Sequence, residues 1–266
     1  MAASVSTSMI WNGQGPVHVG TYDPVKGRPE RGFLTDNYSV GCGNRTLTAT
    51  PSRETATITE SCSGQRLTLK EIETAKSLEV ALSMVQFDSR TLAHAFYGSA
   101  VTKAAGTVTD EQLAELQPGD YFFLKYPRSK SVVIEDASSG SPKTYVQGTH
   151  YEVSDAAHSR YRLLAHPSGN TEPLKVDYEY EGFINIAAFS KTNVEKGIIF
   201  SGVNGDGQKV RVIIPRISLA MDGDFGWIGD EASELSLKGQ ALYVPELQTD
   251  PLFGPFMRID VMPDAP

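Results

Sequence analysis

The stretch SLEVALSMVQFDSRTLAHAFYGSA, from Ser77 to Ala100, changes its hydrophobic period at its midpoint. In the first half, apolar and polar residues alternate strictly, which is the pattern of a strand with one buried face. The side chains predicted for the core are Leu78, Val80 and Leu82. The polar side chains on the opposite face are Ser77, Glu79 and Ser83, and this face must meet water or another polar surface.

The second half of the stretch predicts a short helix. Asp88 or Ser89 is placed to cap its first turn, because a side-chain oxygen there accepts from free backbone N–H groups. Leu92 and Phe96 then fall on one face and are expected to dock the helix onto the core, since so short a helix is marginal alone. Gly98 stands where a left-handed residue often ends a helix.

Composition limits the function classes. The chain has 266 residues, and its formal net charge of −8 disfavours sequence-specific binding to a phosphate backbone. The first residues lack the pattern of a secretory signal, and no apolar run is long enough to span a bilayer, so we expect a protein folded in a cytoplasm. Cys42 and Cys62 are expected as two small buried thiols, with a disulfide as the alternative.

Changes in residue composition and in strand pattern along the chain predict its domain organisation. Residues 1–36 are rich in Gly, Pro and polar side chains and are expected to form an extended arm. Residues 37–105 and 183–245 contain long strand patterns and are expected to form the two halves of one core. Residues 106–182 hold many short strands and predict an inserted β module, and residues 246–266 predict a C-terminal tail that binds a neighbour or is loosely held.

Turn signals refine this β-rich outline. SCSGQ, from Ser61 to Gln65, predicts a hairpin tip, and NGDG after Val203 predicts a second hairpin turn. Pro51 is expected either to interrupt a strand or to separate two strands. The apolar parity of QKVRVIIPRISLAM reverses at Pro215, which predicts a β-bulge or an edge position.

No catalytic motif stands out. None of the five histidines has a partner at metal-ligand spacing, and His94 is expected to be solvated or merely hydrogen-bonded. A Ser–His–Asp set from Asp88, Ser89 and His94 would point in different directions on a short helix. The acidic run MDGDFGWIGDE departs from a calcium-binding loop and is better explained as a turn between strands, with an irregular cation site as the minority alternative. We therefore expect neither an enzyme nor a cofactor.

The order of features resembles that of bacteriophage tail tube (major tail) proteins. The resemblance is carried by NYSVGCGNRTLTATPSRETATITES, by the strand and helix of SLEVALSMVQFDSRTLAHAFYGSA, and by GIIFSGVNGDGQKVRVIIPRISLAMDGDFGWIGDEASELSLKGQALY near the end. It covers roughly 37–243 and concerns pattern and order, because the family has no invariant catalytic motif.

The resemblance implies a mainly β fold of two packed antiparallel sheets with a short flanking α-helix, here with the inserted β module on the exterior. It also implies a structural virion protein whose hexameric rings stack into a hollow tail tube, through which DNA passes without sequence-specific binding. Tape-measure, tail terminator and baseplate or tip proteins would be its partners, with no membrane contact. It would be assembled in the host cytoplasm and located in the virion tail.

Residue roles follow from this expected fold. The lumen or a subunit contact is predicted for Ser77, Glu79, Ser83, Ser61, Ser63 and Gln65. Core packing is predicted for Leu78, Val80, Leu82, Leu92 and Phe96.

Two alternatives stay open on sequence alone. One is a tube protein of a related contractile or secretion system. The other is a β-sandwich carbohydrate-binding module, in which the tyrosines of TYVQGTHYEV and KVDYEYEG would form the binding face.

Overall fold

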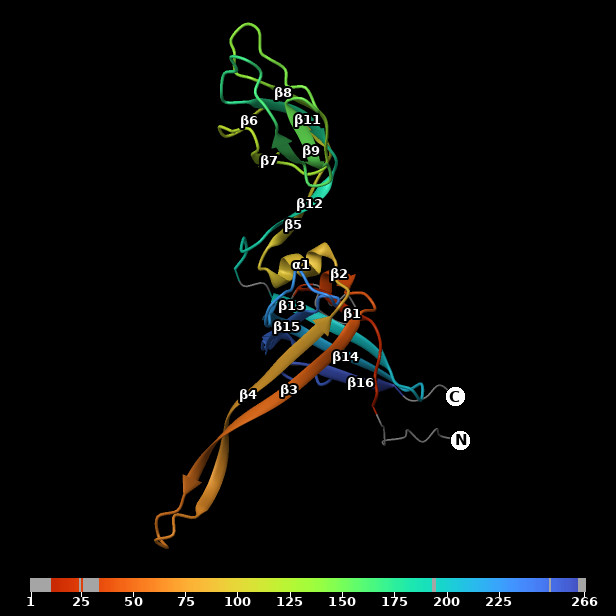
Figure 1. Ribbon diagram of the computed structural model, residues 1–266. Coiled ribbons are helices and arrows are strands. Elements are labelled where there is room, and N and C mark those ends of the chain that lie inside the picture. Colours follow the sequence, from red (N-terminus) through yellow and green to blue (C-terminus); the bar gives the residue numbers. More distant parts are fainter. Residues whose placement is uncertain (1–10, 24, 26–33, 193–194, 249, 263–266) are drawn as a thin grey trace. The chain divides into compact units, whose positions relative to one another are not determined.

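The computed structural model is mainly antiparallel β-sheet with one α-helix (Figure 1). It describes residues 11–23, 25, 34–192, 195–248 and 250–262. The chain divides into two compact units, one comprising Met1–Ser99 with Ile186–Pro266 and the other comprising Ala100–Asn185. The second unit is thus an insertion in the first, and the expected module at 106–182 lies inside it.

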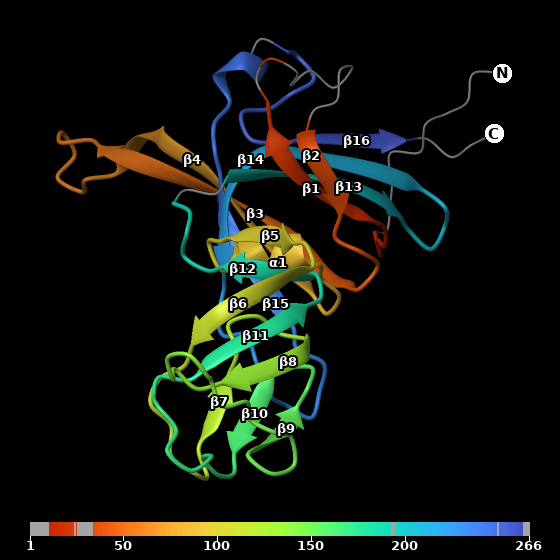
Figure 2. The ribbon, with the colours of Figure 1, turned by 90° about the horizontal axis from the view of Figure 1, so that it is seen from above.

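The first unit is built on one eight-stranded antiparallel sheet. Its strands are β1 (Val17–Tyr22), β2 (Leu34–Ser39), β3 (Asn44–Thr59), β4 (Thr68–Met84), β13 (Glu195–Val203), β14 (Lys209–Met221), β15 (Leu235–Ala241) and β16 (Arg258–Met262). The order across the sheet is β2-β1-β13-β14-β15-β4-β3, and β16 pairs with the first half of β14 (Figure 2). One continuous sheet therefore stands in this unit where two packed sheets were expected.

The sheet curls so that strands far apart in its order face one another. Val17 of β1 and Leu47 of β3 lie near opposite ends of the strand order, yet both line one concave space. The core cluster draws buried side chains from β1, β4, β13, β14 and β15. Curling lets a single sheet enclose its own apolar face.

The buried strand face and the helix cap predicted within residues 77–100 are both found in the structure. Leu78, Val80 and Leu82 are buried in the core of the first unit. Helix α1 (Ser89–Ala95) begins at the predicted cap, where the Asp88 carboxylate accepts from the Thr91 N–H at 2.8 Å. Burial opposes ionisation of Asp88, but hydrogen bonds from Thr91 and Arg90 outweigh it and lower its pKa.

The helix docks by a different face from the predicted one. Its buried residues are Thr91, Ala93, His94 and Ala95. Leu92 and Phe96 are both half-buried, and Phe96 packs against the core cluster. The left-handed residue after the helix is Tyr97, with φ 49°, so the role predicted for Gly98 is wrong. Gly98 instead allows close backbone approach, because a Cβ there would lie 2.4 Å from the Ala187 carbonyl oxygen.

The turn and bulge predictions are confirmed. Residues 204–207 join β13 to β14, with the Gly207 N–H donating to the Asn204 carbonyl at 3.1 Å. Opposite β13, the ladder of β14 gains one residue between Ile214 and Ile217, which places a bulge at Pro215. Pro51 does not divide its segment, because β3 continues through it.

Both chain ends contribute more to the sheet than expected. β1 lies within the predicted arm, and its Val17 and Val19 are buried. β16 lies within the predicted tail and pairs with β14. The arm and tail predictions are wrong for these segments because their partner strands lie far away in the sequence. The rest of the arm includes residues 1–10, 24 and 26–33, which are outside the described residues.

The second unit is a small β structure with its own core. One three-stranded sheet has the order β7-β10-β9, from β7 (Tyr121–Phe123), β9 (Tyr151–Asp155) and β10 (Arg160–Leu163). The other has the order β6-β11-β8, from β6 (Gly106–Gln112), β8 (Ser129–Glu135) and β11 (Lys175–Tyr180). Buried side chains of both sheets form one cluster, which makes the unit independent of the core of the first.

A two-stranded ladder forms where the chain passes between the units, from β5 (Ser99–Lys103) and β12 (Phe183–Ala187). A 3₁₀ turn, η2 (Pro245–Leu247), follows β15. Within the described part of the chain, no helix combines the length and apolar character needed to cross a membrane.

Candidate functional site

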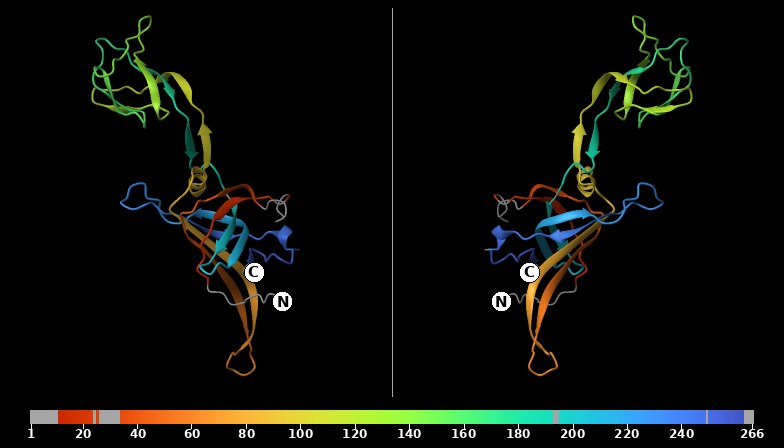
Figure 3. Two further views of the ribbon diagram at one scale, coloured as in Figure 1. Left: turned by 90° about the vertical axis from the view of Figure 1, so that its right-hand side faces the viewer. Right: turned by 90° about the vertical axis from the view of Figure 1, so that its left-hand side faces the viewer.

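The β3–β4 hairpin extends beyond the sheet to which it belongs (Figures 1 and 3). Near its base, β4 pairs with β15 on one side and with β3 on the other, whereas the pairing with β15 ends at Glu79. Beyond that point only two strands continue, and residues 50–59 and 68–77 are exposed throughout. We call residues 50–77 the distal hairpin.

The distal hairpin carries large apolar side chains that the described chain covers only in part. They are Ile58, Leu67, Leu69 and Ile72, of which Leu69 is the most exposed at 70%. An isolated two-stranded ribbon is at best marginally stable in water. This segment therefore has both the shape and the composition of a surface that is completed by another molecule.

The hairpin tip is organised by one carboxylate. Glu60 accepts from the Cys62 N–H at 2.6 Å and the Ser63 N–H at 2.9 Å, and also from the Ser63 hydroxyl. These bonds, led by the one from the Ser63 hydroxyl, lower the pKa of Glu60 to about 2. Three residues of this turn are exposed: Ser61, Ser63 and Gln65. The hairpin tip, for which the sequence predicts the lumen or a subunit contact, is therefore accessible to another subunit.

Two strands, β2 and β3, end the strand order of the sheet, and each has an outer edge without a partner among the described residues. A third free edge belongs to β16, which pairs only with β14 in the described chain. Open edges promote pairing with another chain, and proteins that stay monomeric usually block them. The edge of β3 is the longest, because the strand runs from Asn44 to Thr59.

The polar face predicted on β4 does not form one uniform surface. Ser77 is exposed, and Glu79 is half-buried with its carboxylate 3.0 Å from the Lys238 ammonium group. Ser83 is buried, with its hydroxyl 2.8 Å from that of Thr46. A lumen position for Ser83 is therefore wrong in the described fold, because β3 lies alongside and covers it.

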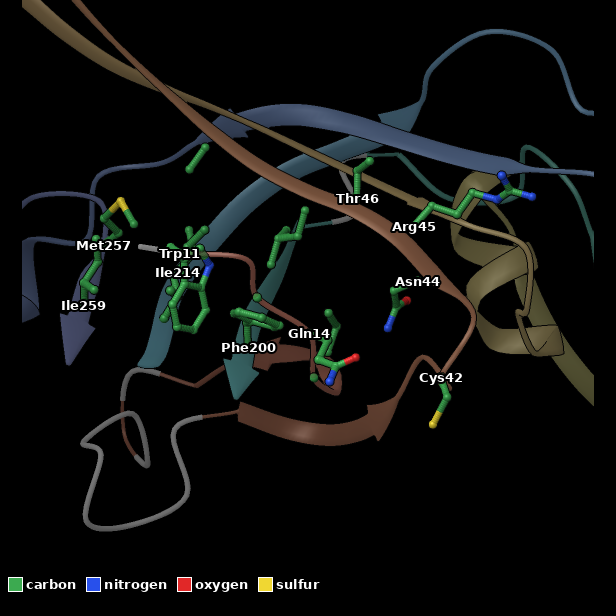
Figure 4. Close-up of a pocket in the computed structure, with 16 residues that line it drawn as sticks. Trp11, Gln14, Cys42, Asn44, Arg45, Thr46, Phe200, Ile214, Met257 and Ile259 are labelled. Carbon is green, nitrogen blue, oxygen red and sulfur yellow. The ribbon is translucent and has the colours of Figure 1, made fainter. Parts of the chain in front are cut away.

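A concave space of about 540 Å³ lies between β3 and the strands that face it (Figure 4). Its inner wall is apolar and includes Phe200 and Ile214, whereas Gln14, Asn44 and Arg45 line it with polar groups. The space marks where β3 faces β1, β13 and β14 across the curled sheet without pairing with them.

The loop that joins β14 to β15 exposes a second apolar feature. Within residues 224–231, Trp227 is 73% exposed and Ile228 is 98% exposed. The base of the loop is held by aromatic contacts, since the Trp227 ring lies 4.8 Å from that of Phe225 and stacks at 6.2 Å on Phe96. We call residues 224–231 the Trp-Ile loop.

The tyrosines proposed as a carbohydrate-binding face belong instead to the core of the second unit. Tyr145, Tyr151, Tyr178 and Tyr180 are all buried. Burial raises the pKa of Tyr145 to about 12, with the charges of Glu172 and Asp136 adding to the effect. A buried ring cannot stack on a sugar, so that version of the alternative is wrong.

Sequence reasoning also misplaced the thiols and one histidine. Cys42 and Cys62 are free and exposed, in a bend before β3 and in the hairpin tip. His94 is buried at 4% exposure, and neither ring nitrogen has a hydrogen-bond partner in the described chain. Burial, assisted by the positive charges of Lys196 and Lys191, lowers the pKa of His94 to about 4. No local pattern indicated this buried position, because tertiary packing decides which face of the helix meets the sheet.

The described residues contain no group of three or more His, Cys, Asp or Glu side chains placed to hold a metal ion. The cation site considered for MDGDFGWIGDE is therefore not formed by its acids, which lie on an exposed loop. The features that this structure offers for function are surfaces: the distal hairpin, the free edges and the Trp-Ile loop.

Comparison with known proteins places the chain in a family. No curated protein matches the chain. A family model described as protein of unknown function UCP028589 matches residues 10–260. This match includes both units and nearly all the strands, so the chain belongs to the UCP028589 family.

Proposed function

We propose that this protein is a structural subunit that polymerises, as stacked hexameric rings, into the tail tube of a bacteriophage virion. DNA would pass through the tube without sequence-specific binding, and tape-measure, terminator and baseplate or tip proteins would bind its ends. The observation that carries the proposal is the distal hairpin, an exposed ribbon with large apolar side chains that are only partly covered.

The hairpin supports assembly because its stability and its composition both require a partner. A ribbon with solvent on both faces gains little from burial, whereas packing it on another subunit removes its apolar area from water. Each fully buried Leu or Ile side chain contributes about 1.5–3 kcal/mol to such a contact. Four such side chains, Ile58, Leu67, Leu69 and Ile72, lie along this ribbon.

The free edges and the charge support a ring and its lumen. Contacts between unlike patches that close by rotation give rings, and a second such contact stacks them. The outer edges of β2 and β3 are unlike patches of this kind. A net charge of −8 suits a passage in which DNA must not adhere.

Negative-stain electron microscopy with light scattering tests the proposal directly. We expect six-fold rings or hollow tubes in concentrated protein, or on addition of preformed tube ends. A protein that remains monomeric under both conditions would contradict the proposal.

A hairpin replacement tests the observation behind it. Replacing residues 55–74 by Asn-Gly retains the pairing of Glu54 with Ala75 and closes the ladder with a tight turn. We expect the replacement variant to keep its unfolding transition but to form no rings or tubes. Shortening the exposed turn 139–142 of the second unit is the matched control and should leave assembly intact. Normal rings from the hairpin variant would remove the hairpin from the assembly.

A further inference from the structure

A groove at the base of the distal hairpin has the properties of a docking site. It has a volume of about 500 Å³ and is lined by residues 51–53, 76–78 and 254–257. Pro51, Leu78 and Phe256 contribute apolar walls, and Arg53 and Lys76 contribute positive charge. We call it the hairpin-base groove.

The positive charges of this groove are available to a partner. The Arg53 side chain has no hydrogen bond or ion pair with any described residue, and the residue is exposed. Lys76 pairs with Glu73 at 2.8 Å, but both side chains are exposed. Such surface pairs contribute about 0–1 kcal/mol, so Lys76 can exchange its partner at little cost.

The Trp-Ile loop is complementary to the groove in both polarity and charge. It presents two large apolar side chains, and residues 222–234 contain five acids and no basic residue. Asp224, Asp230 and Glu231 have no ion pair with any described residue. An exposed tryptophan beside unpaired charges is a typical anchor of a protein interface.

The strand register shows that the loop and the groove of one chain are far apart. Arg258 pairs with Ile213 in the middle of β14, and this places residue 257 of the groove beside that point. The loop begins only after β14 ends at Met221. The eight intervening residues span roughly 26 Å of strand. In Figure 3 the loop after β14 projects to the side away from the segment that precedes β16.

We propose that the Trp-Ile loop of one subunit inserts into the hairpin-base groove of a second copy of this chain. Trp227 and Ile228 pack on the apolar walls, and the flanking acids pair with Arg53 and Lys76. Because the loop and the groove are different patches, the contact is head-to-tail and propagates from copy to copy. It rests on the proposed self-assembly and specifies one of its subunit contacts.

Disulfide trapping between two single-cysteine proteins tests this contact. The background carries Cys42→Ser and Cys62→Ser, since both native thiols are exposed. One protein then carries Ile228→Cys and the other, with a longer tag, carries Ser77→Cys. We expect oxidation of the mixture to give the mixed heterodimer at least fivefold more than the control pair of Ile228→Cys with Ser141→Cys, an exposed position in the second unit. Equal yields from the two pairs would overturn the proposal.

Charge reversal gives an independent measurement. Arg53→Glu should lower the heterodimer yield severalfold, and Asp224→Lys with Asp230→Lys on the opposite partner should restore it. Lys130→Glu, an exposed position in the second unit, should have no effect. Loss of yield without restoration would contradict the charge pairing.

Microscopy of the same samples separates this proposal from the tube proposal. Rings or tubes without the 228–77 crosslink would refute the contact and leave the tube standing. The crosslink in open oligomers that never form rings or tubes would support the contact and refute the tube.

Discussion

The two halves of the β3–β4 hairpin share one hydrogen-bonded ladder but have opposite environments. Near the base, Leu78, Val80 and Leu82 of β4 are buried in the core of the curled sheet. From the tip to the base, residues 68–77 of the same strand are all exposed. Backbone pairing is therefore enough to continue a strand, but only packing makes that strand stable on its own. The packed half of the hairpin stabilises the fold of its own subunit, whereas the exposed half is available for contact with another molecule.

The largest expected effect comes from truncating one side chain in each half. Leu82→Ala should cost about 2–5 kcal/mol of unfolding free energy because it leaves a cavity in the core. The matched variant Ile72→Ala should change the free energy by less than about 0.5 kcal/mol. Urea unfolding followed by tryptophan fluorescence measures the first unit selectively, since Trp11 and Trp227 both belong to it. Similar costs at the two positions would remove the distinction between the halves.

A pH titration sharpens the same comparison, because His94 belongs to the packed end. Its pKa is lowered to about 4 in the folded chain, compared with about 6.5 when unfolded, so the unfolded chain binds more protons between these values. The contribution of His94 is complete above pH 6.5, falls as the pH decreases, and amounts to a loss of about 3 kcal/mol by pH 4.

Urea midpoints at pH 7.5, 5.5 and 4.5 measure this loss. His94→Leu should flatten the dependence, since it removes the titrating group and two unsatisfied buried nitrogens. An unchanged slope in His94→Leu would assign the acid sensitivity to other groups. Hydrogen exchange in the distal hairpin should show no corresponding change between pH 7.5 and 5.5 once the intrinsic rates are corrected.

A smaller effect on folding than that of Leu82→Ala or of His94 protonation is expected at the border of the two halves. Glu79→Lys replaces the exposed pair with Lys238 by two like charges, and should cost no more than about 1 kcal/mol. We expect the variant to fold but to assemble with altered yield, as measured by sedimentation, with Glu79→Gln as the control. An unaltered assembly would show that Glu79 faces no subunit contact.

The sequence predicted features that depend on neighbouring residues and missed those that depend on distant ones. The strand at 78–84, the Asp88 cap and the Pro215 bulge all follow from local pattern. The strands β1 and β16 were missed, because β1 acquires its role only by pairing with β13, more than 170 residues away.

The candidate surfaces show the same limit. The hairpin tip followed from its turn residues, but no pattern in the threonine-rich strands revealed that packing stops beyond Ser77. The burial of His94 depends on which helix face the curled sheet receives, and that is decided by tertiary packing.

The pairing of β1 with β13 also has a consequence for synthesis. Val17 pairs with Phe200, so the first strand waits for more than 170 further residues to be translated before it finds its partner. At about 5–20 residues per second this wait is roughly 10–40 s. The local β3–β4 ladder and the second unit lie earlier in the chain, whereas residues 254–257 of the hairpin-base groove are translated after both of them. Until residues 254–257 have been translated, the groove has only the wall that the hairpin provides, so the order of translation itself delays the formation of a complete docking site.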